Sequence, residues 1–254
     1  MKVIDKTKKF YKRFKGQKGV IGFSFQGRPI YCFKIKKSSH PVIIVQCAIH
    51  AREHITARLC LKLMEDFARF GSSGTVYFLP IVNPDGVNIA ERINPLYKAN
   101  ARGVDLNVNF DARWGTGKSN VRVAGAQNYI GDKPFSEPES KALKDFTLMV
   151  MPDITVSYHA KGEEIYFEFF QKENFIRDKI IANAVASVMG YKVKGTPFSA
   201  GGYKDWCISS LKIPSLTIEV GKDSLKHPLK KGALKDIYKK NKLVLKVLTE
   251  RIWK

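Results

Sequence analysis

Two residues of types that bind metal ions, His50 and Glu53, follow the apolar run at residues 42–45 and precede an apolar-periodic stretch that starts at Thr56. A histidine and a glutamate three positions apart at the end of a buried strand can turn towards one point and share a Zn²⁺ ion. Catalytic zinc sites take three protein ligands and leave one position open for water, and two histidines with one glutamate are a known set. The pair therefore predicts a third ligand, and a carboxylate that acts on the water, elsewhere in the chain.

A second pairing is open at the same place. His50 and His54 lie four residues apart, the spacing that puts two zinc ligands on one helix face in H-E-x-x-H proteins. Here Glu53 is adjacent to the second histidine and not to the first, and the strand-like residues place His50 before the helix. We therefore pair His50 with Glu53 and assign His54 to the surroundings of the site or to the surface. The simpler explanation of the pair alone is a structural histidine beside a common glutamate.

Two further strand ends supply the missing groups. His159 ends an apolar strand and is the best candidate for the third ligand, because His40 and His227 each precede a proline in a basic loop. Glu219 ends another apolar strand, where a carboxylate is costly unless it has a partner or a task. A buried ion pair is the alternative explanation for Glu219. Together the four residues form the parts of metal-assisted hydrolysis, with a general base beside the metal.

The order of the elements that position these residues indicates the fold class. Apolar strands alternate with helices, which predicts an α/β fold with a doubly wound, mostly parallel mixed sheet flanked by helices. Ligands bind at the carboxyl ends of the strands in such sheets. We expect residues 1–254 to form a single catalytic domain. The predicted strands are 33–36, 42–47, 76–82, 154–158, 164–170 and 214–220; the predicted helices are 1–10, 56–70, one through 150 that is N-capped at Ser136, 174–189 and 235–253; Asn83–Gly86 is a predicted turn and 88–135 a long loop.

The chain is strongly basic, with 44 Lys and Arg against 23 Asp and Glu and a net charge of +21. Such a charge implies an anionic partner. The lysines are scattered and no nucleic-acid-binding motif is present, so we expect no nucleic acid partner and favour an anionic substrate. Solvated lysine faces are the simplest alternative.

No apolar run approaches the ~20 residues that a membrane span needs, and the N-terminus lacks the apolar core of a signal peptide. Four cysteines without C-x-x-C spacing suit a reducing compartment. These features predict a cytoplasmic protein, although a secreted form trimmed of its signal would look the same, and we expect a monomer.

Several segments, in order, resemble landmarks of the zinc metallocarboxypeptidases, the family of carboxypeptidase A, over roughly residues 22–220. The family has an α/β fold of the predicted kind. The segments are H-A-R-E at 50–53, N-P-D-G at 83–86, G-V-D-L-N at 103–107, Y-I-G-D-K-P-F-S-E-P-E at 129–139, G-G-Y-K-D-W at 201–206 and T-I-E at 217–219.

The resemblance implies a role for each matching residue. His50, Glu53 and His159 would hold one Zn²⁺ per chain, and Glu219 would take a proton from the zinc-bound water and pass it to the leaving nitrogen. An arginine shortly before G-V-D would polarise the scissile carbonyl and stabilise the oxyanion. Arg102 is the candidate for this role; the spacing also admits Arg92 or Lys98.

The departures from the family pattern bear on the substrate. The family has Asn-Arg after G-V-D-x, a pair that binds the terminal carboxylate of the substrate, whereas this chain has Asn107 followed by Val108. Asn107 remains a predicted substrate-binding residue, and Arg113 from the following loop is a candidate to replace the missing arginine, although the bidentate clamp is in doubt.

The family also carries a tyrosine several residues before G-G-x-x-D-W. Residues 196–198 (TPF) stand there in this chain, and Tyr203 is a candidate to replace part of that function or is simply an aromatic pocket wall. Lys204 occupies the position that reads the substrate side chain in related enzymes. A lysine there favours an acidic group, with a surface lysine as the alternative.

Residues 159–167 (HAKGEEIYF) resemble the H-S-x-G-x-x-I-Y pattern of the bacterial murein peptidases of this family, which cut the γ-D-glutamyl–diaminopimelate bond of peptidoglycan stem peptides. The leading hypothesis is therefore a zinc peptidase that acts on an anionic peptide or muropeptide at this linkage. One alternative is an ordinary carboxypeptidase that releases C-terminal residues, with acidic residues as one option. The other alternative is a non-catalytic binder of anionic polymers.

Overall fold

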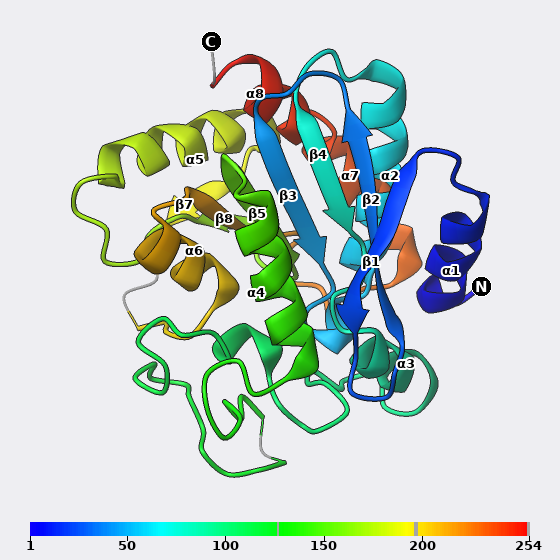
Figure 1. The fold of residues 1–254 in the computed structure, drawn as a ribbon, viewed down its shortest axis with the longest axis vertical. Coiled ribbons are helices and arrows are strands. Elements are labelled where there is room, and N and C mark those ends of the chain that lie inside the picture. The colour runs from blue at the N-terminus through cyan, green and yellow to red at the C-terminus, as the bar shows by residue number, and fades with distance from the viewer. Residues whose placement is uncertain (126, 196–197, 253–254) are drawn as a thin grey trace.

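The computed structural model describes residues 1–125, 127–195 and 198–252. Eight strands form one mixed sheet in the order β1-β2-β4-β3-β5-β8-β6-β7, with helices on both faces (Figure 1). The strands are β1 (Gln17–Phe23), β2 (Pro29–Lys36), β3 (Val42–Cys47), β4 (Thr75–Leu79), β5 (Ile154–His159), β6 (Glu164–Tyr166), β7 (Lys192–Lys194) and β8 (Ser215–Glu219).

The helices alternate with these strands along the chain. They are α1 (Val3–Arg13), η1 (Ala51–Glu53), α2 (Ile55–Phe70), α3 (Pro84–Arg92), η2 (Leu106–Val108), α4 (Pro138–Val150), α5 (Phe175–Met189), α6 (Tyr203–Leu211), η3 (Lys231–Ala233), α7 (Leu234–Asn241) and α8 (Val244–Glu250). Among the described residues, no helix combines the length and the apolar character needed to cross a membrane.

The centre of the sheet is parallel and its margins are mixed. β3 pairs in parallel with both β4 and β5, and β5 pairs in parallel with β8. β2 runs antiparallel to β1 and β4, and β6 runs antiparallel to β8 but parallel to β7. The predicted α/β fold with a mostly parallel mixed sheet is confirmed.

The central strands are apolar on both sides because helices cover both faces. Val45 and Cys47 of β3 belong to a core formed with α2, α5, α7 and α8, whereas Ile44 belongs to a second core formed with α4 and α6. This two-sided burial explains why the β3 run VIIV has no polar alternation. It also fixes the strand ends rigidly, so the residues that follow them are precisely placed.

Several predicted boundaries are wrong. Residues 83–86 are not an isolated turn: Asn83 accepts a hydrogen bond from the Gly86 N–H (2.9 Å) and caps α3, with Pro84 in the first turn, where its missing N–H costs nothing. Glu137, not Ser136, precedes α4. The long loop therefore starts after Arg92.

Other elements differ in extent. The predicted strand 164–170 ends at Tyr166, and the predicted helix 235–253 is divided into α7 and α8 around Lys242 and Leu243. The last residue of that predicted helix, Trp253, lies outside the described residues. Strands β1 and β7 and helix α6 are additional to the prediction, and their short or Gly-rich sequences explain why no periodicity indicated them.

The carboxyl ends of β3, β5 and β8 lie side by side, since the register pairs Cys47 with Tyr158 and His159 with Glu219. The long segments between α3 and α4 lie on the side of the sheet towards which β3 and β4 point (the lower side of Figure 1). The fold thus places the residues at the carboxyl ends of β3, β5 and β8 next to one another, on the side of the sheet where the segments between α3 and α4 lie.

Candidate active site

The three predicted ligands lie together at the carboxyl ends of β3 and β5. His50 immediately precedes η1, Glu53 ends it, and His159 ends β5. His50 Nδ1 lies 2.9 Å from Glu53 Oε1, and His159 Nδ1 lies 3.1 Å from Glu53 Oε2. All three side chains are buried, and one potential ligand atom from each lies within 4.8 Å of the others. The short turn η1 is what brings Glu53 back beside His50.

The donor set fits a metal ion. The Nδ1 atoms of His50 and His159 lie 3.2 Å apart, both facing the same carboxylate. Two imidazole nitrogens that face each other cannot both present lone pairs at this distance without repulsion, and a cation between them removes it. Two histidines and a glutamate, with no fourth protein ligand among the described residues, are the set that leaves an open position on Zn²⁺.

Asp105 fixes the orientation of His50. Its Oδ1 lies 3.1 Å from His50 Nε2 and also accepts the Asn107 N–H at 3.0 Å. A carboxylate at the far nitrogen keeps the proton on Nε2 and leaves Nδ1 free for a metal ion. Burial opposes the charged form of His50, yet Glu53 and Asp105 outweigh burial and raise the pKa of this histidine to about 9. Burial and the nearby cations lower the pKa of His159.

Glu219 lies on the strand next to the ligands, in register with His159. Its Oε2 is buried and has no hydrogen-bond partner among the described residues. Burial and the negative charges of Glu53 and Glu164 raise the pKa of Glu219 well above its usual range. A carboxylate with raised proton affinity, beside a metal-binding cluster and without a structural partner, suits proton transfer better than an ion pair.

A row of polar side chains lies directly below the ligands on the same face of the sheet. Gln46, Ser157 and Thr217 are in register on β3, β5 and β8. The Gln46 amide and Ser157 Oγ are buried and have no hydrogen-bond partner among the described residues. One rung further, Thr155 and Ser215 satisfy each other at 2.5 Å. Gln46 and Ser157 therefore have unused hydrogen-bonding capacity that water or a polar substrate group would fill.

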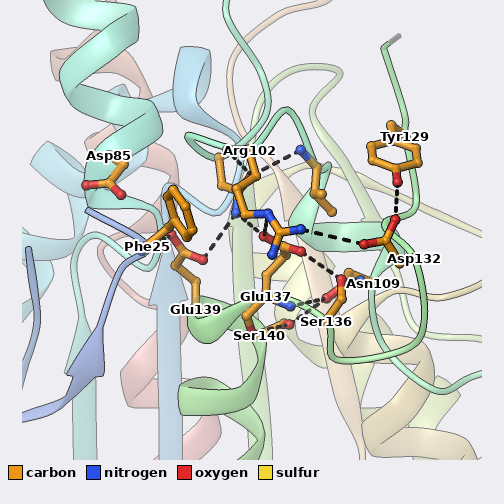
Figure 2. A network of polar contacts seen from close by, with 12 residues as sticks. Phe25, Asp85, Arg102, Asn109, Tyr129, Asp132, Ser136, Glu137, Glu139 and Ser140 are labelled. Atoms are coloured by element: carbon orange, nitrogen blue, oxygen red, sulfur yellow. Dashed lines mark hydrogen bonds and ion pairs between the residues drawn. The ribbon is translucent and has the colours of Figure 1, made fainter. Parts of the chain in front are cut away.

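The structure places Arg102 away from this cluster, in contrast to the prediction. Its guanidinium lies 3.5 Å from Asp132 Oδ2 and 3.8 Å from the buried Glu137 Oε2, and stacks over the Phe25 ring (Figure 2). Asn100 donates to Glu137 at 2.8 Å in the same network. Arg102 is thus held by the acidic start of α4, which corrects its assignment to the scissile carbonyl.

Lys98, one of the two sequence alternatives to Arg102, lies near the cluster. Its Nζ is 2.6 Å from Asp105 Oδ2, so one carboxylate separates it from His50. Its positive charge acts on His50, His159 and Glu219: it contributes to the lowered pKa of His159 and opposes the raised pKa values of His50 and Glu219. Arg92, the other alternative, pairs with Asp5 on the exposed surface of α1.

The two substrate-binding predictions on α6 are not supported. Tyr203 is completely buried and its hydroxyl shares a hydrogen bond of 2.8 Å with Thr147, so it is a core residue and offers no substrate contact. Lys204 is 5% exposed, pairs with Asp205 Oδ1 at 2.5 Å and donates to the Glu168 carbonyl at 2.8 Å. Its charge is already compensated inside the protein, which removes the argument for an acidic group in its pocket.

Asn107 and Arg113 have different surroundings. Asn107 is half-buried beside Asp105, and its Oδ1 accepts the Tyr203 N–H at 3.3 Å. Arg113 is exposed and its guanidinium stacks on the Phe170 ring at 4.1 Å. Two of the residues at the place of the family's tyrosine, Thr196 and Pro197, lie outside the described residues.

Sequence reasoning missed three residues near the cluster. Arg52, between the first two ligands, has a buried Nε without a partner among the described residues. His227, which was set aside, lies near enough for Glu53 and His50 to act on it, although burial dominates and lowers its pKa. Asp105 could have been recognised as the only acid of the G-V-D-L-N segment. His54 lies outside the ligand set, as predicted. Burial lowers the pKa of His54, and the charge of Glu91 partly opposes this shift.

Comparisons with known proteins agree with this arrangement. The sequence profile of the zinc carboxypeptidase family matches residues 4–243. Gamma-D-glutamyl-L-diamino acid endopeptidase 1 of Lysinibacillus sphaericus is 28% identical over 245 residues, which cover 82% of this chain and 61% of the relative. Carboxypeptidase B2 of Rattus norvegicus is 29% identical over 194 residues, covering 67% of this chain and 46% of that protein. The chain thus spans about half to three fifths of these relatives.

Solved structures support the same fold. Bovine thrombin-activatable fibrinolysis inhibitor superposes with a TM-score of 0.85 at 22% identity, covering 98% of this chain and 94% of that one. Murein-tripeptide amidase from Escherichia coli O157 superposes with a TM-score of 0.65 at 23% identity, covering 91% and 92% of the two chains. At these identities the superpositions establish the fold.

Proposed function

The chain belongs to the zinc carboxypeptidase family, and from this premise we propose that residues 1–254 act as one catalytic domain, a peptidase that uses one Zn²⁺ held by His50, Glu53 and His159. The observation that carries the proposal is the convergence of these three buried side chains beside Glu219, a carboxylate with no structural partner among the described residues. When bound, Zn²⁺ polarises a carbonyl and lowers the pKa of water. The family and the donor set both favour zinc.

Glu219 acts as the general base in this proposal. Its carboxylate takes a proton from the attacking water molecule at Oε2 and delivers the proton to the nitrogen of the leaving group. Burial and the charge of Glu53 raise the pKa of Glu219, and the higher proton affinity helps its carboxylate to take up the proton that it later donates. No described residue forms a hydrogen bond that would compete for Oε2, which is therefore available for this transfer.

Lys98 supplies the positive charge that the resemblance assigned to an arginine. Its ammonium is held near the ligands by Asp105 at 2.6 Å, and it stabilises negative charge that develops on the carbonyl oxygen in the transition state. A lysine is a point charge and not a planar fork, so it acts through charge and not through bidentate geometry.

Replacing Lys98 by methionine is expected to lower kcat by ~10²-fold, the effect of losing one oxyanion donor, and to change KM little. Arg102→Gln serves as the matched control, because Arg102 pairs with Asp132 and Glu137 instead, and should change kcat less than about threefold. Steady-state kinetics of both variants measure this. A larger loss for Arg102→Gln than for Lys98→Met would reverse the assignment.

We infer that the substrate is a peptidoglycan stem peptide cut at the γ-D-glutamyl–meso-diaminopimelate bond. Three features support this: a relative at 28% identity is named for a γ-D-glutamyl linkage, Val108 stands where the usual carboxylate-binding arginine would be, and the net charge is +21. An ordinary carboxypeptidase is the second candidate, favoured by the similarity to carboxypeptidase B2.

Two substrate sets separate these candidates. L-Ala-γ-D-Glu-meso-diaminopimelate should be hydrolysed at the γ-glutamyl amide, with release of diaminopimelate detected by chromatography. Acyl-dipeptides with a free α-carboxylate, and the same peptides with a terminal amide, form the second set. Hydrolysis of only the free-carboxylate acyl-dipeptides would reject the murein substrate and favour the ordinary carboxypeptidase.

A further inference from the structure

We propose that three cation–aromatic pairs, whose cations all lie on the loop after η2, form a rim that binds carboxylates of the substrate lying outside the scissile bond. The pairs are Arg113 on Phe170, Lys118 on Phe198 and Arg122 on Trp114, and we call them the cation–aromatic rim. The inference deepens the proposed peptidase function by giving its substrate class: peptides that carry two or more carboxylates.

The three cations of the rim lie on one stretch of chain, while Phe170 and Phe198 reach them from two other segments. The guanidinium carbons of Arg113 and Arg122 lie 4.1 and 4.8 Å from the ring centres of their partners, and Lys118 Nζ lies 5.7 Å from that of Phe198. Phe170 is 60% exposed and Phe198 is 69% exposed. Large aromatic side chains exposed to this degree contribute little to folding, and a local group of them is characteristic of a binding surface.

The three cations have no acidic partner. Within the described part of the chain, no carboxylate lies within 4.0 Å of the nitrogens of Arg113, Lys118 or Arg122. By contrast, Lys98 near the metal-binding cluster is paired with Asp105, and Lys204 on α6 is paired with Asp205. The cations of the rim therefore carry charge that no carboxylate of the described residues compensates.

Stacking prepares the two arginines for carboxylates. A guanidinium lying flat on a ring loses side-chain freedom before the ligand arrives, while its N–H edges stay free for bidentate hydrogen bonds. Ordering of the side chain is part of what binding normally costs. The exposed rings add apolar contact for the carbon skeleton of the ligand. This chemistry fits a carboxylate on a short aliphatic stem.

The rim is tied to the catalytic cluster through the backbone. The Phe110 N–H donates to the Gly201 carbonyl at 2.9 Å, the Gly201 N–H donates to the Ala112 carbonyl at 2.8 Å, and the Lys118 N–H donates to the Phe198 carbonyl at 3.0 Å. The loop follows η2, whose N-cap residue Asp105 contacts His50. In this proposal, a peptide whose scissile amide lies at the cluster extends towards the rim.

The rim also accounts for Val108. Where the family has a single arginine that binds the terminal carboxylate, this chain has an apolar residue, and its free cations stand further along the loop. A ligand with one terminal carboxylate would reach at most one pair. A ligand with several carboxylates would engage more than one, which favours acidic peptides over ordinary C-terminal residues.

The test measures binding to zinc-loaded protein carrying Glu219→Gln, so that hydrolysis is not required. Two acidic ligands are titrated by calorimetry, L-Ala-γ-D-Glu-meso-diaminopimelate and an α-linked Glu-Ala-Glu peptide, each beside its fully amidated counterpart. Arg113→Gln should raise the Kd of the acidic ligands at least about tenfold, corresponding to one charge-assisted hydrogen bond. The Kd of the amidated ligands should change less than twofold. Arg113→Lys should restore part of the loss.

The chain contains a matched control. Arg69 stacks on the exposed Phe70 at 5.0 Å at the end of α2, remote from the rim in sequence and outside the loop. Arg69→Gln removes the same charge and the same kind of contact, and should leave every Kd unchanged. Thermal melts of both variants identify any general loss of stability.

Three results would overturn the proposal: equal weakening of acidic and amidated ligands by Arg113→Gln, an equal effect of Arg69→Gln, or absence of carboxylate-dependent binding. A single-stranded oligonucleotide that binds as tightly as the acidic peptides, with the same loss on Arg113→Gln, would show a general polyanion surface instead. Failure of the murein substrate to be hydrolysed would affect the proposed function alone, because the α-linked peptide still tests the rim.

Discussion

The Glu219→Gln variant is expected to lose at least about 10²-fold in kcat/KM while keeping one zinc per chain. Glutamine preserves the size of the side chain and removes the ability of Oε2 to take a proton. The free Oε2, the raised pKa and the position in register with His159 are the features that make a large effect on the chemical step the expected outcome. Steady-state kinetics measure kcat/KM, and metal analysis of the same samples measures the zinc content per chain.

Glu65→Gln, a change of an exposed glutamate on α2, is the control for general effects of losing one negative charge. It should leave kcat/KM unchanged. A loss of less than tenfold for Glu219→Gln, with zinc retained, would contradict the assignment of the general base. Zinc binding without hydrolysis of any peptide by the unmodified chain would instead favour a non-catalytic binder.

Replacing His159 by alanine is expected to remove stoichiometric zinc and to abolish measurable peptidase activity. Only His50 and Glu53 would then remain of the ligand set. Metal that binds the folded chain stabilises it, by about 2.7 kcal/mol at a free concentration one hundred times Kd. A chelator should therefore lower the Tm of the unmodified protein and leave that of His159→Ala unchanged.

The matched control is His54→Ala, which removes the histidine of the competing H-x-x-x-H pairing. His54 belongs outside the ligand cluster, so this variant should keep one zinc and the chelator-dependent shift of Tm. Loss of zinc in His54→Ala with retention in His159→Ala would show that the alternative pairing is the correct one. Metal content and differential scanning calorimetry together decide between them.

The metal-binding residues could be predicted because strand ends are the best-determined points of an α/β sheet. An apolar run such as VIIV specifies a buried strand, and its last residue must lie at the carboxyl edge. His159 and Glu219 are the last residues of β5 and β8, and His50 follows shortly after Cys47, the last residue of β3. The α/β class followed from the same alternation of elements.

Arg102 could not be placed in the same way. It lies in a segment without hydrophobic periodicity, where the direction of a side chain depends on distant partners. Its actual partner Glu137 is 35 positions away, and Lys98 is held by Asp105. Proximity to G-V-D in sequence therefore selected the cation that pairs with the start of α4, whereas Lys98 pairs with the aspartate that contacts His50.

The errors at Tyr203 and Lys204 have a different cause. The G-G-Y-K-D-W segment carries two glycines and was interpreted from the resemblance as a pocket wall. It is the start of α6, packed against β5 and β8, with Asp205 accepting the Gly202 N–H at 3.1 Å. A helix start buried on the sheet turns Tyr203 into the core and leaves Lys204 to pair within its own turn.

His50 and His159 are 109 positions apart and meet only because β3 and β5 are neighbours. A chain with unformed sheet retains at most the local pair His50 and Glu53, which cannot complete the centre. Binding of the metal ion therefore requires long-range assembly of the sheet. It reports the folding step in which β5 pairs with β3. Pulsed addition of zinc during refolding would follow this docking step directly, since closure over so many residues is slow compared with helix formation.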